Sequence, residues 1–206
     1  MLAALRQLLP EPDSFSDKQL LETYAAVESR LESGPYLTYR EVLTRGARKL
    51  GRQLGVTLGD DACRGFAESI QDWQPFPDTV EALRLLGTRF RLGIISNVDD
   101  DLFAATQEKL QAPFEFVVTA QQVRSYKPSL RNFHEALKRS GARKEEMLHA
   151  AQSIYHDIVP ANELGIANAW IDRRFAQHGF GATLPARAQP MLEVRSLAEL
   201  AERLIS

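Results

Sequence analysis

The chain has 206 residues, of which 44% are hydrophobic and 25% are charged, and its formal net charge is −2 at pH 7. This length allows one domain with an insertion or two small domains, and the charge pattern gives no reason to expect nucleic acid or a membrane as a partner. The single cysteine, Cys63, excludes an internal disulfide and fits a reducing compartment. The apolar N-terminal run is interrupted by Arg6 and is too short for a membrane span or signal sequence. We expect a cytoplasmic protein with a small-molecule partner.

The first third of the chain has only helical periodicity. Apolar residues recur at helical spacing over 2–9, 16–31, 38–54 and 60–70, which predicts four helices. Pro75 and Pro77 disfavour helix before them and change the local composition. The sequence therefore predicts an all-α domain over 1–74 and a second domain over 75–206.

Beyond Pro75, segments typical of strands and helices alternate. Strands are predicted at 91–96, 114–119, 148–153 and 168–172, with helices at 79–86, 101–110, 129–140 and 158–164. Asp78 is expected to cap the first of these helices. A loop over 175–189, a short strand at 191–194 and a helix at 196–204 complete the domain. The alternation indicates an α/β fold with a parallel sheet wrapped by helices on both faces.

Polar residues follow three of the predicted strands. Ser96 and Asn97, then Lys127, then Asp157 recur at intervals of about thirty residues, the length of one strand and helix repeat. Because parallel strands end at one edge of a sheet, we expect these side chains to surround one cleft that faces the helical domain. A hydroxyl, an amide and an ammonium there can hold an anion, and a carboxylate can orient water.

Each of these residues also has a structural interpretation. Ser96 could be a turn residue, Lys127 a solvated surface group and Asp157 a helix cap. His134, His149 and His178 show no metal-ligand spacing relative to His156 and Asp157, and a histidine at a helix start is the simpler interpretation of His156. The joint placement of the polar residues at strand ends is the argument for a site.

Three runs in this part of the chain resemble motifs of a known superfamily. Ile-Ile-Ser-Asn at 94–97, Ser-Tyr-Lys-Pro at 125–128 and Ala-Gln-Ser-Ile-Tyr-His-Asp at 151–157 resemble the second, third and fourth motifs of the haloacid dehalogenase superfamily, and the type II 2-haloacid dehalogenase-like branch is the most similar. The resemblance covers most of the chain. It implies a Rossmannoid core and an all-α cap inserted between the first and second core strands.

The resemblance also implies a chemistry. In this superfamily an aspartate attacks the substrate, displaces halide or accepts a phosphoryl group, and water cleaves the intermediate. By match, Ser96 and Asn97 would contact the substrate carboxylate or phosphate, Lys127 would neutralise negative charge at the nucleophile, and Asp157 would position water or metal. The expected substrate is a small anionic organic molecule.

The superfamily's first motif has no counterpart in this chain. Its nucleophile follows a strand ahead of the cap, whereas this sequence starts within what resembles the first cap helix. Asp13 and Asp17 lie in a polar stretch with no apolar strand before them, which predicts loop or capping roles. The resemblance therefore predicts that the central first strand and its nucleophile are missing, that the chain was truncated, and that residues 1–206 are inactive. Whether the protein is an enzyme stays open.

Other departures affect the substrate and the cofactor. Gln152 stands where phosphatases of the superfamily place an aspartate, so we expect poor metal affinity and no cofactor, with Mg²⁺ as the candidate cofactor if the protein is a phosphatase. Phe133 and Ile154 replace a Tyr and an Asn of the dehalogenases, and no cap arginine is evident among Arg30, Arg40 and Arg45. A Mg²⁺-dependent small-molecule phosphatase and a non-catalytic binding or regulatory protein of the same fold are the alternatives. A homodimer is also left open.

Overall fold

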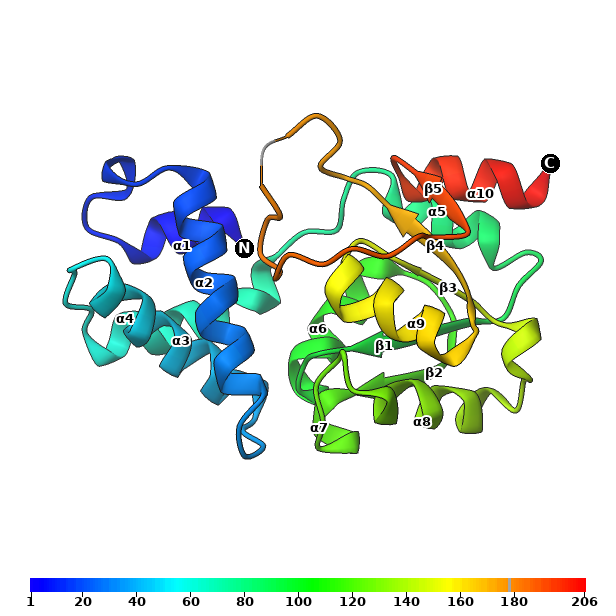
Figure 1. Ribbon diagram of the computed structural model, residues 1–206, viewed down its shortest axis with the longest axis horizontal. Coiled ribbons are helices and arrows are strands. Elements are labelled where there is room, and N and C mark those ends of the chain that lie inside the picture. Colours follow the sequence, from blue (N-terminus) through cyan, green and yellow to red (C-terminus); the bar gives the residue numbers. More distant parts are fainter. Residues whose placement is uncertain (178) are drawn as a thin grey trace. The chain divides into compact units, whose positions relative to one another are not determined.

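The computed structural model describes residues 1–177 and 179–206. His178, one of the histidines without ligand spacing, falls in the loop predicted over 175–189 and lies outside the described residues. The chain divides into two compact units, a helical unit of Met1–Trp73 with residues 179–184, and an α/β unit of Gln74–Gln177 with Pro185–Ser206. The division falls one residue before the position predicted from the prolines, and part of the predicted loop belongs to the helical unit. Figure 1 shows the helices and strands of both units.

The helical unit is built from four helices and confirms the helical periodicity of the first third of the chain. The helices are α1 (Leu2–Leu8), α2 (Asp17–Glu32), α3 (Tyr39–Gln53) and α4 (Asp60–Glu68), joined in part by the 3₁₀ turns Pro12–Ser14 and Ser69–Asp72. Local caps set two of the starts. The Ser16 hydroxyl accepts a hydrogen bond from the backbone of α2, and Thr38 forms a capping box at the start of α3.

The core of this unit forms where α2 and α3 approach closely. Tyr24 of α2 is fully buried and packs edge-on against Phe66 of α4 at a centroid distance of 5.5 Å. Gly46 of α3 permits the approach, because an added Cβ there would lie 3.2 Å from a Tyr24 ring carbon. Cys63 is also fully buried, which agrees with a packing role.

One carboxyl group is enclosed in this helical core. Glu28 of α2 is 8% exposed, and the Tyr39 hydroxyl donates a hydrogen bond to its Oε1 at 3.1 Å. Burial raises the pKa of Glu28 to about 7, although the Tyr39 hydrogen bond acts in the opposite direction. The folded helical unit therefore retains a proton on Glu28 at pH values where the unfolded chain has released it.

This buried carboxyl should make the stability of the helical unit fall as pH rises. The folded-state pKa is above the unfolded value, so the stabilisation is complete below about pH 4 and is lost as pH rises through about 7. Glu28→Gln should remove this slope and raise the free energy of unfolding at pH 8 by about 2–3 kcal/mol. Urea unfolding followed by circular dichroism measures the effect, with the exposed Glu68→Gln as control. An unchanged pH slope in Glu28→Gln would contradict it.

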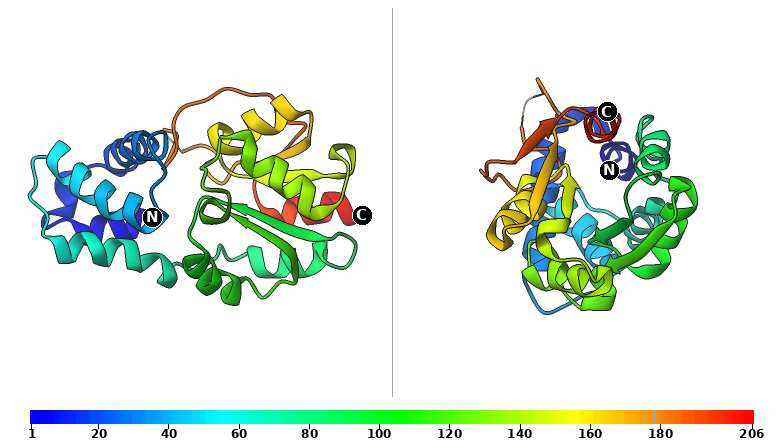
Figure 2. Two further views of the ribbon diagram at one scale, coloured as in Figure 1. Left: turned by 90° about the horizontal axis from the view of Figure 1, so that it is seen from below. Right: turned by 90° about the vertical axis from the view of Figure 1, so that its right-hand side faces the viewer.

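The α/β unit contains five parallel strands and confirms the α/β fold (Figures 1 and 2). Its strands are β1 (Leu92–Ser96), β2 (Phe114–Thr119), β3 (Leu148–Ala151), β4 (Ala167–Ile171) and β5 (Leu192–Val194). Its helices are α5 (Thr79–Leu86), α6 (Asp100–Leu110), α7 (Ala120–Val123), α8 (Leu130–Ser140), α9 (Val159–Leu164) and α10 (Leu197–Ile205), with a 3₁₀ turn at Lys144–Glu146 and a π-helical turn at Ile154–Ile158. The short helix α7 and the π-helical turn were not predicted from periodicity, because each is only about one turn long.

These strands form two separate sheets. β1 pairs with β2, whereas β3, β4 and β5 form a second sheet in that order. Within the described residues β1 and β3 therefore each have a single strand partner, and neither is hydrogen-bonded to the other. β1 and β3 are thus edge strands, and each presents one unpaired edge of backbone donors and acceptors.

Helices pack on both faces of β1, as the alternation of strands and helices predicted. Leu92 packs with α5 and α10, whereas Ile95 packs with Phe133 of α8 and Ala161 of α9. Leu92 and Ile95 are three positions apart, so they point to opposite faces of the strand. In the second sheet, Ala169 and Val194 pack against Leu200 of α10. No helix of the described residues is long and apolar enough to cross a membrane.

The predicted role of Asp78 as the cap of α5 is wrong. Its side chain makes no capping hydrogen bond to that helix. Its carboxylate instead accepts hydrogen bonds from the backbone amides of Leu197 at 2.7 Å and Ala198 at 3.3 Å, at the start of α10, and from both terminal nitrogens of Arg173 at 2.8 and 3.1 Å. Asp78 has helical backbone angles, which direct its carboxylate away from the first amides of α5.

Loss of the Asp78 carboxylate should destabilise the α/β unit. Burial raises its pKa, but the hydrogen bonds from Arg173 and the two amides outweigh burial and lower it overall. Asp78→Asn leaves Arg173 without its charge partner, and we expect a loss of about 2–4 kcal/mol in the free energy of unfolding at neutral pH. Because the pKa is lowered on folding, the difference between variant and parent should shrink as pH falls below about 4.

Trp170 fluorescence during urea unfolding reports on the α/β unit, because this residue lies on β4. Trp73 would be replaced by Phe in both proteins to remove the other tryptophan signal. The exposed Glu81→Gln on α5 is the matched control. A loss below about 0.5 kcal/mol for Asp78→Asn, the range of ordinary surface substitutions, would show that the contact does not hold α10 in place.

Candidate functional site

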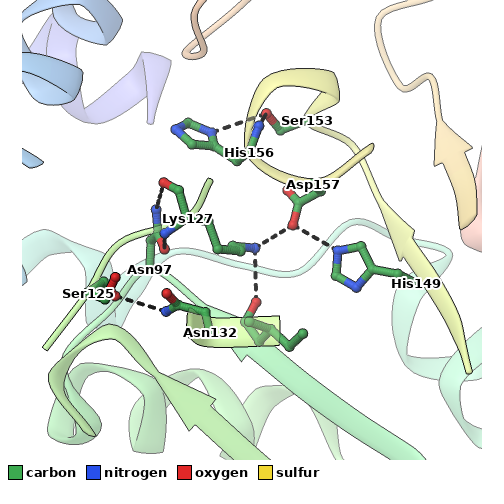
Figure 3. A network of polar contacts seen from close by, with 9 residues as sticks. Asn97, Ser125, Lys127, Asn132, His149, Ser153, His156 and Asp157 are labelled. Atoms are coloured by element: carbon green, nitrogen blue, oxygen red, sulfur yellow. Dashed lines mark hydrogen bonds and ion pairs between the residues drawn. The ribbon is translucent and has the colours of Figure 1, made fainter. Parts of the chain in front are cut away.

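The predicted site residues lie at the carboxyl ends of β1 and β3. β1 ends at Ser96, and the turn after β3 contains Asp157. The ammonium group of Lys127 donates a hydrogen bond to the Ile95 carbonyl of β1 at 3.0 Å and pairs with Asp157 Oδ1 at 2.6 Å (Figure 3). Lys127 therefore connects the end of β1 to the turn that follows β3.

Asn97 holds the backbone of Lys127 in place. Its side-chain amide donates to the Lys127 carbonyl at 3.1 Å, and its side-chain carbonyl accepts from the Lys127 amide at 2.7 Å. The peptide between Lys127 and Pro128 is cis. The structure thus gives Asn97 a positioning contact, while its predicted contact with a substrate stays a prediction.

Asp157 is a buried anion with two hydrogen-bond donors. Its side chain is 6% exposed, and Oδ1 also lies 2.9 Å from His149 Nε2. Burial alone would raise its pKa, but the charge of Lys127 and the contact with His149 outweigh burial and hold the pKa of Asp157 well below its usual range. Asp157 is consequently ionised at neutral pH and can keep Lys127 in a fixed position.

Two of the alternative structural roles are wrong. Lys127 is not a solvated surface group, because its side chain is only 12% exposed and is bonded to a buried carboxylate. Asp157 does not merely cap a helix, because its carboxylate contacts Lys127 and His149, and the capping contact of this turn is made by Ser153. Both residues therefore belong to one buried polar cluster.

His149 is the site residue that the sequence analysis missed. It lies on β3, and its ring packs edge-on against Phe133 at a centroid distance of 5.0 Å. His149 and Asp157 are eight positions apart, which matches no metal-ligand spacing, so the spacing gave no signal. The π-helical turn folds Asp157 back toward β3. A polar residue within a strand that is followed by a tight turn is therefore the sequence pattern that could have indicated His149. The Phe133 ring supports this histidine.

His156 occupies the same turn in its neutral form. The Ser153 hydroxyl oxygen accepts from the His156 backbone amide at 3.0 Å and lies 3.1 Å from its Nδ1. Burial and, to a smaller extent, the nearby Lys127 charge lower the pKa of His156 to about 4, against the opposing effect of Asp157. His156 is therefore uncharged at neutral pH, in agreement with the predicted role at the start of a helix.

Ser96 lies at the edge of this cluster. It is the last residue of β1, pairs with Thr119 of β2 and is partly exposed. The preceding residue, Ile95, supplies the carbonyl that Lys127 contacts. Ser96 therefore directly follows the residue that contacts Lys127, and its predicted contact with a substrate anion stays a prediction.

The donor set of the described residues does not fit a magnesium ion. No group of three or more His, Cys, Asp or Glu residues in this part of the chain could hold a metal. Asp157 Oδ1 is already shared by Lys127 and His149, and Gln152 supplies a neutral amide where a second acid would be needed. A hard divalent cation prefers several anionic oxygens, which these residues do not provide.

The chain is similar in sequence to characterised haloacid dehalogenases. A sequence profile of the family described as haloacid dehalogenase-like hydrolase matches residues 18–171. The (S)-2-haloacid dehalogenase of Pseudomonas putida is 27% identical over 176 residues, which cover 84% of this chain and 75% of that protein. A glyceraldehyde 3-phosphate phosphatase of Methanothermobacter thermautotrophicus is 34% identical over 100 residues, which cover 46% of this chain and 43% of that protein.

Solved structures give the same fold. The L-2-haloacid dehalogenase of Xanthobacter autotrophicus with covalently bound chloropropionic acid superposes with a TM-score of 0.77 at 16% identity, covering 99% of this chain and 91% of that one. Another L-2-haloacid dehalogenase superposes with a TM-score of 0.80 at 20% identity, covering 100% and 91% of the two chains. Because the family profile matches most of the sequence, this chain belongs to the haloacid dehalogenase-like hydrolases and is related to the 2-haloacid dehalogenases.

Proposed function

We propose that this chain carries the substrate-binding and charge-stabilising residues of a 2-haloacid dehalogenase-type hydrolase for a small anionic organic substrate. The observation that carries the proposal is the buried pair of Lys127 and Asp157 beside the unpaired edges of β1 and β3. We further propose that the nucleophilic aspartate lies on an additional strand that pairs with both of these edges. Residues 1–206 without that strand are then inactive. The relationship to the (S)-2-haloacid dehalogenases supports the substrate class.

The residues of the site have distinct roles in this proposal. An incoming aspartate carboxylate would attack the carbon that bears the halogen, form an ester and release halide, and water would then cleave the ester. Lys127 would neutralise the attacking carboxylate, and the Asp157 charge would keep Lys127 in position. Ser96 and Asn97 would contact the carboxylate of the substrate. No step requires a metal.

Two other functions remain as proposals of lower priority. The similarity to a glyceraldehyde 3-phosphate phosphatase favours a phosphatase, although Gln152 and the engaged Asp157 are poor ligands for Mg²⁺. A non-catalytic protein would keep anion binding at Lys127 without turnover. For every one of these functions we expect a small-molecule ligand, with neither nucleic acid nor a membrane as partner. We propose a cytoplasmic location and leave a homodimer open.

The test is an assay of the chain extended by the first-motif strand of the Pseudomonas putida relative. Halide release from (S)-2-chloropropionate and phosphate release from phosphate monoesters are measured with and without Mg²⁺. Halide release that is independent of Mg²⁺ is the expected result. Phosphate release that requires Mg²⁺ would support the phosphatase instead. Anion binding without either product, in a folded protein, would indicate the non-catalytic function.

A further inference from the structure

The helical unit contains a cavity of about 260 Å³ that plays no part in the site described above. Val27 and Arg30 of α2 and Lys49, Arg52 and Gln53 of α3 line it. Val27 is 2% exposed, whereas the other four side chains are exposed. Most of the cavity surface is apolar, and the three cations and the amide border it with exposed side chains, all from the helical unit.

The three cations at this cavity differ from most others of the unit. Arg45 and Arg48 lie on α3, the helix of Lys49, and each forms an ion pair, Arg45 with Glu41 and Arg48 with Asp60. Arg6 and Arg64 also have acidic partners. In the part of the chain that the structure describes, Arg30, Lys49 and Arg52 have no ion pair. Three like charges around one cavity repel each other, and this repulsion falls when an anion binds between them.

The chemistry of the lining indicates the kind of anion. Guanidinium groups bind phosphate and carboxylate oxygens in a bidentate manner, and the ammonium of Lys49 adds a point charge. A cavity of about 260 Å³ is slightly smaller than the usual small-molecule site of about 300–1,000 Å³ and is too small for a macromolecular interface. The formal net charge of −2 also argues against a polyanion such as nucleic acid.

We propose that the cavity lined by Arg30, Lys49 and Arg52 binds a small multivalent anion that carries phosphate or carboxylate groups. The site belongs to the helical unit and uses none of Ser96, Lys127 or Asp157. It is independent of the proposed reaction and needs no nucleophile. Its ligand would be a metabolite-sized anion that stabilises the helical unit by binding only to the folded form.

Isothermal titration calorimetry of the full chain with inorganic pyrophosphate, and separately with citrate, tests the site. We expect saturable binding to one site, weakened at least tenfold in the double variant Arg30→Gln with Arg52→Gln. The control double variant Arg45→Gln with Arg64→Gln removes the same charge from positions that are already ion-paired. It should bind like the parent, apart from the small effect of net charge that salt screens. The probe that binds more tightly identifies the phosphate or the carboxylate as the preferred group.

Nuclear magnetic resonance of the methyl groups locates the ligand. Pyrophosphate or citrate should shift the Val27 methyl signals with the affinity measured by calorimetry. Three results would overturn the proposal: no saturable binding at millimolar concentration, equal weakening in both double variants, or shifts confined to residues around Lys127. Circular dichroism confirms that each variant is folded, and Arg30→Lys with Arg52→Lys should retain part of the binding because the charge is kept.

Discussion

Lys127→Met should lower the free energy of unfolding of the α/β unit by about 3–5 kcal/mol at neutral pH, because it leaves the Asp157 charge buried without its cation partner. The same change removes the contact to the Ile95 carbonyl, so the ends of β1 and β3 lose their direct connection. Any anion that binds at this site should also bind more weakly, since the site's buried cation is lost.

A double-mutant cycle separates this effect from lost packing. Asp157→Leu combined with Lys127→Met removes both charges, and we expect the double variant to be more stable than Lys127→Met alone. Unfolding is followed by Trp170 fluorescence in the Trp73→Phe background, with the exposed Lys138→Met as control. A loss below about 1 kcal/mol for Lys127→Met would place the pair among ordinary surface ion pairs and refute its role in the site.

The pH dependence of this pair has a defined sign. Folding lowers the pKa of Asp157, so its contribution is present above the unfolded value of about 3.9 and is lost as pH falls below it. The parent should therefore lose stability in acid more steeply than the double variant. Measurements of unfolding between about pH 3 and pH 7 would detect the difference, and parallel curves for the two proteins would contradict it.

A chain extended by a strand that ends in aspartate should be more stable than residues 1–206 and should gain turnover. β1 and β3 each have an unpaired edge in the described structure, and an inserted parallel strand would pair with both. Each new backbone hydrogen bond is worth about 0.5–1.5 kcal/mol, so several of them should raise the free energy of unfolding by a few kcal/mol. Residues 1–206 alone should release neither halide from 2-haloacids nor phosphate from phosphate monoesters.

The control is the same extension with asparagine in place of the new aspartate. It should keep the gain in stability and lose turnover by a factor of about 10⁴ or more, because only covalent catalysis is removed. Asp13→Asn and Asp17→Asn should change neither result. Asp17 begins α2 and pairs with Arg6, and Arg6 also lies 3.5 Å from Asp13, so both acids have local partners in the helical unit. Robust turnover by residues 1–206 that either substitution abolishes would contradict the proposal.

Local signals in the sequence were sufficient to predict most elements of the fold. Helices of the first third follow apolar spacing of three and four, and Ser16 and Thr38 cap them through contacts within a few residues. β2 has the predicted bounds of 114–119, since a short apolar run rich in β-branched residues favours extended backbone whatever surrounds it. These features depend on neighbours in the chain, so the sequence is enough to predict them.

The candidate site was partly predictable for a similar reason. Strand ends recur at regular intervals in an α/β sequence, and polar residues there meet at one edge, which brought Asn97, Lys127 and Asp157 into contact. The role of each residue was less predictable. Asn97 binds the Lys127 backbone, and His149 joins Asp157 from within a strand, although neither contact has a signature in sequence spacing.

What only the tertiary structure decided depends on contacts between residues far apart in sequence. Asp78 has the residue type of a cap for α5, but its carboxylate binds Arg173 and the start of α10, more than ninety residues away. The division of the strands into two sheets likewise depends on pairing between segments. An apolar strand has the same sequence pattern whether one or both of its edges are hydrogen-bonded. Periodicity determines which face of an element is buried, whereas the packing of distant elements decides which polar group reaches which partner.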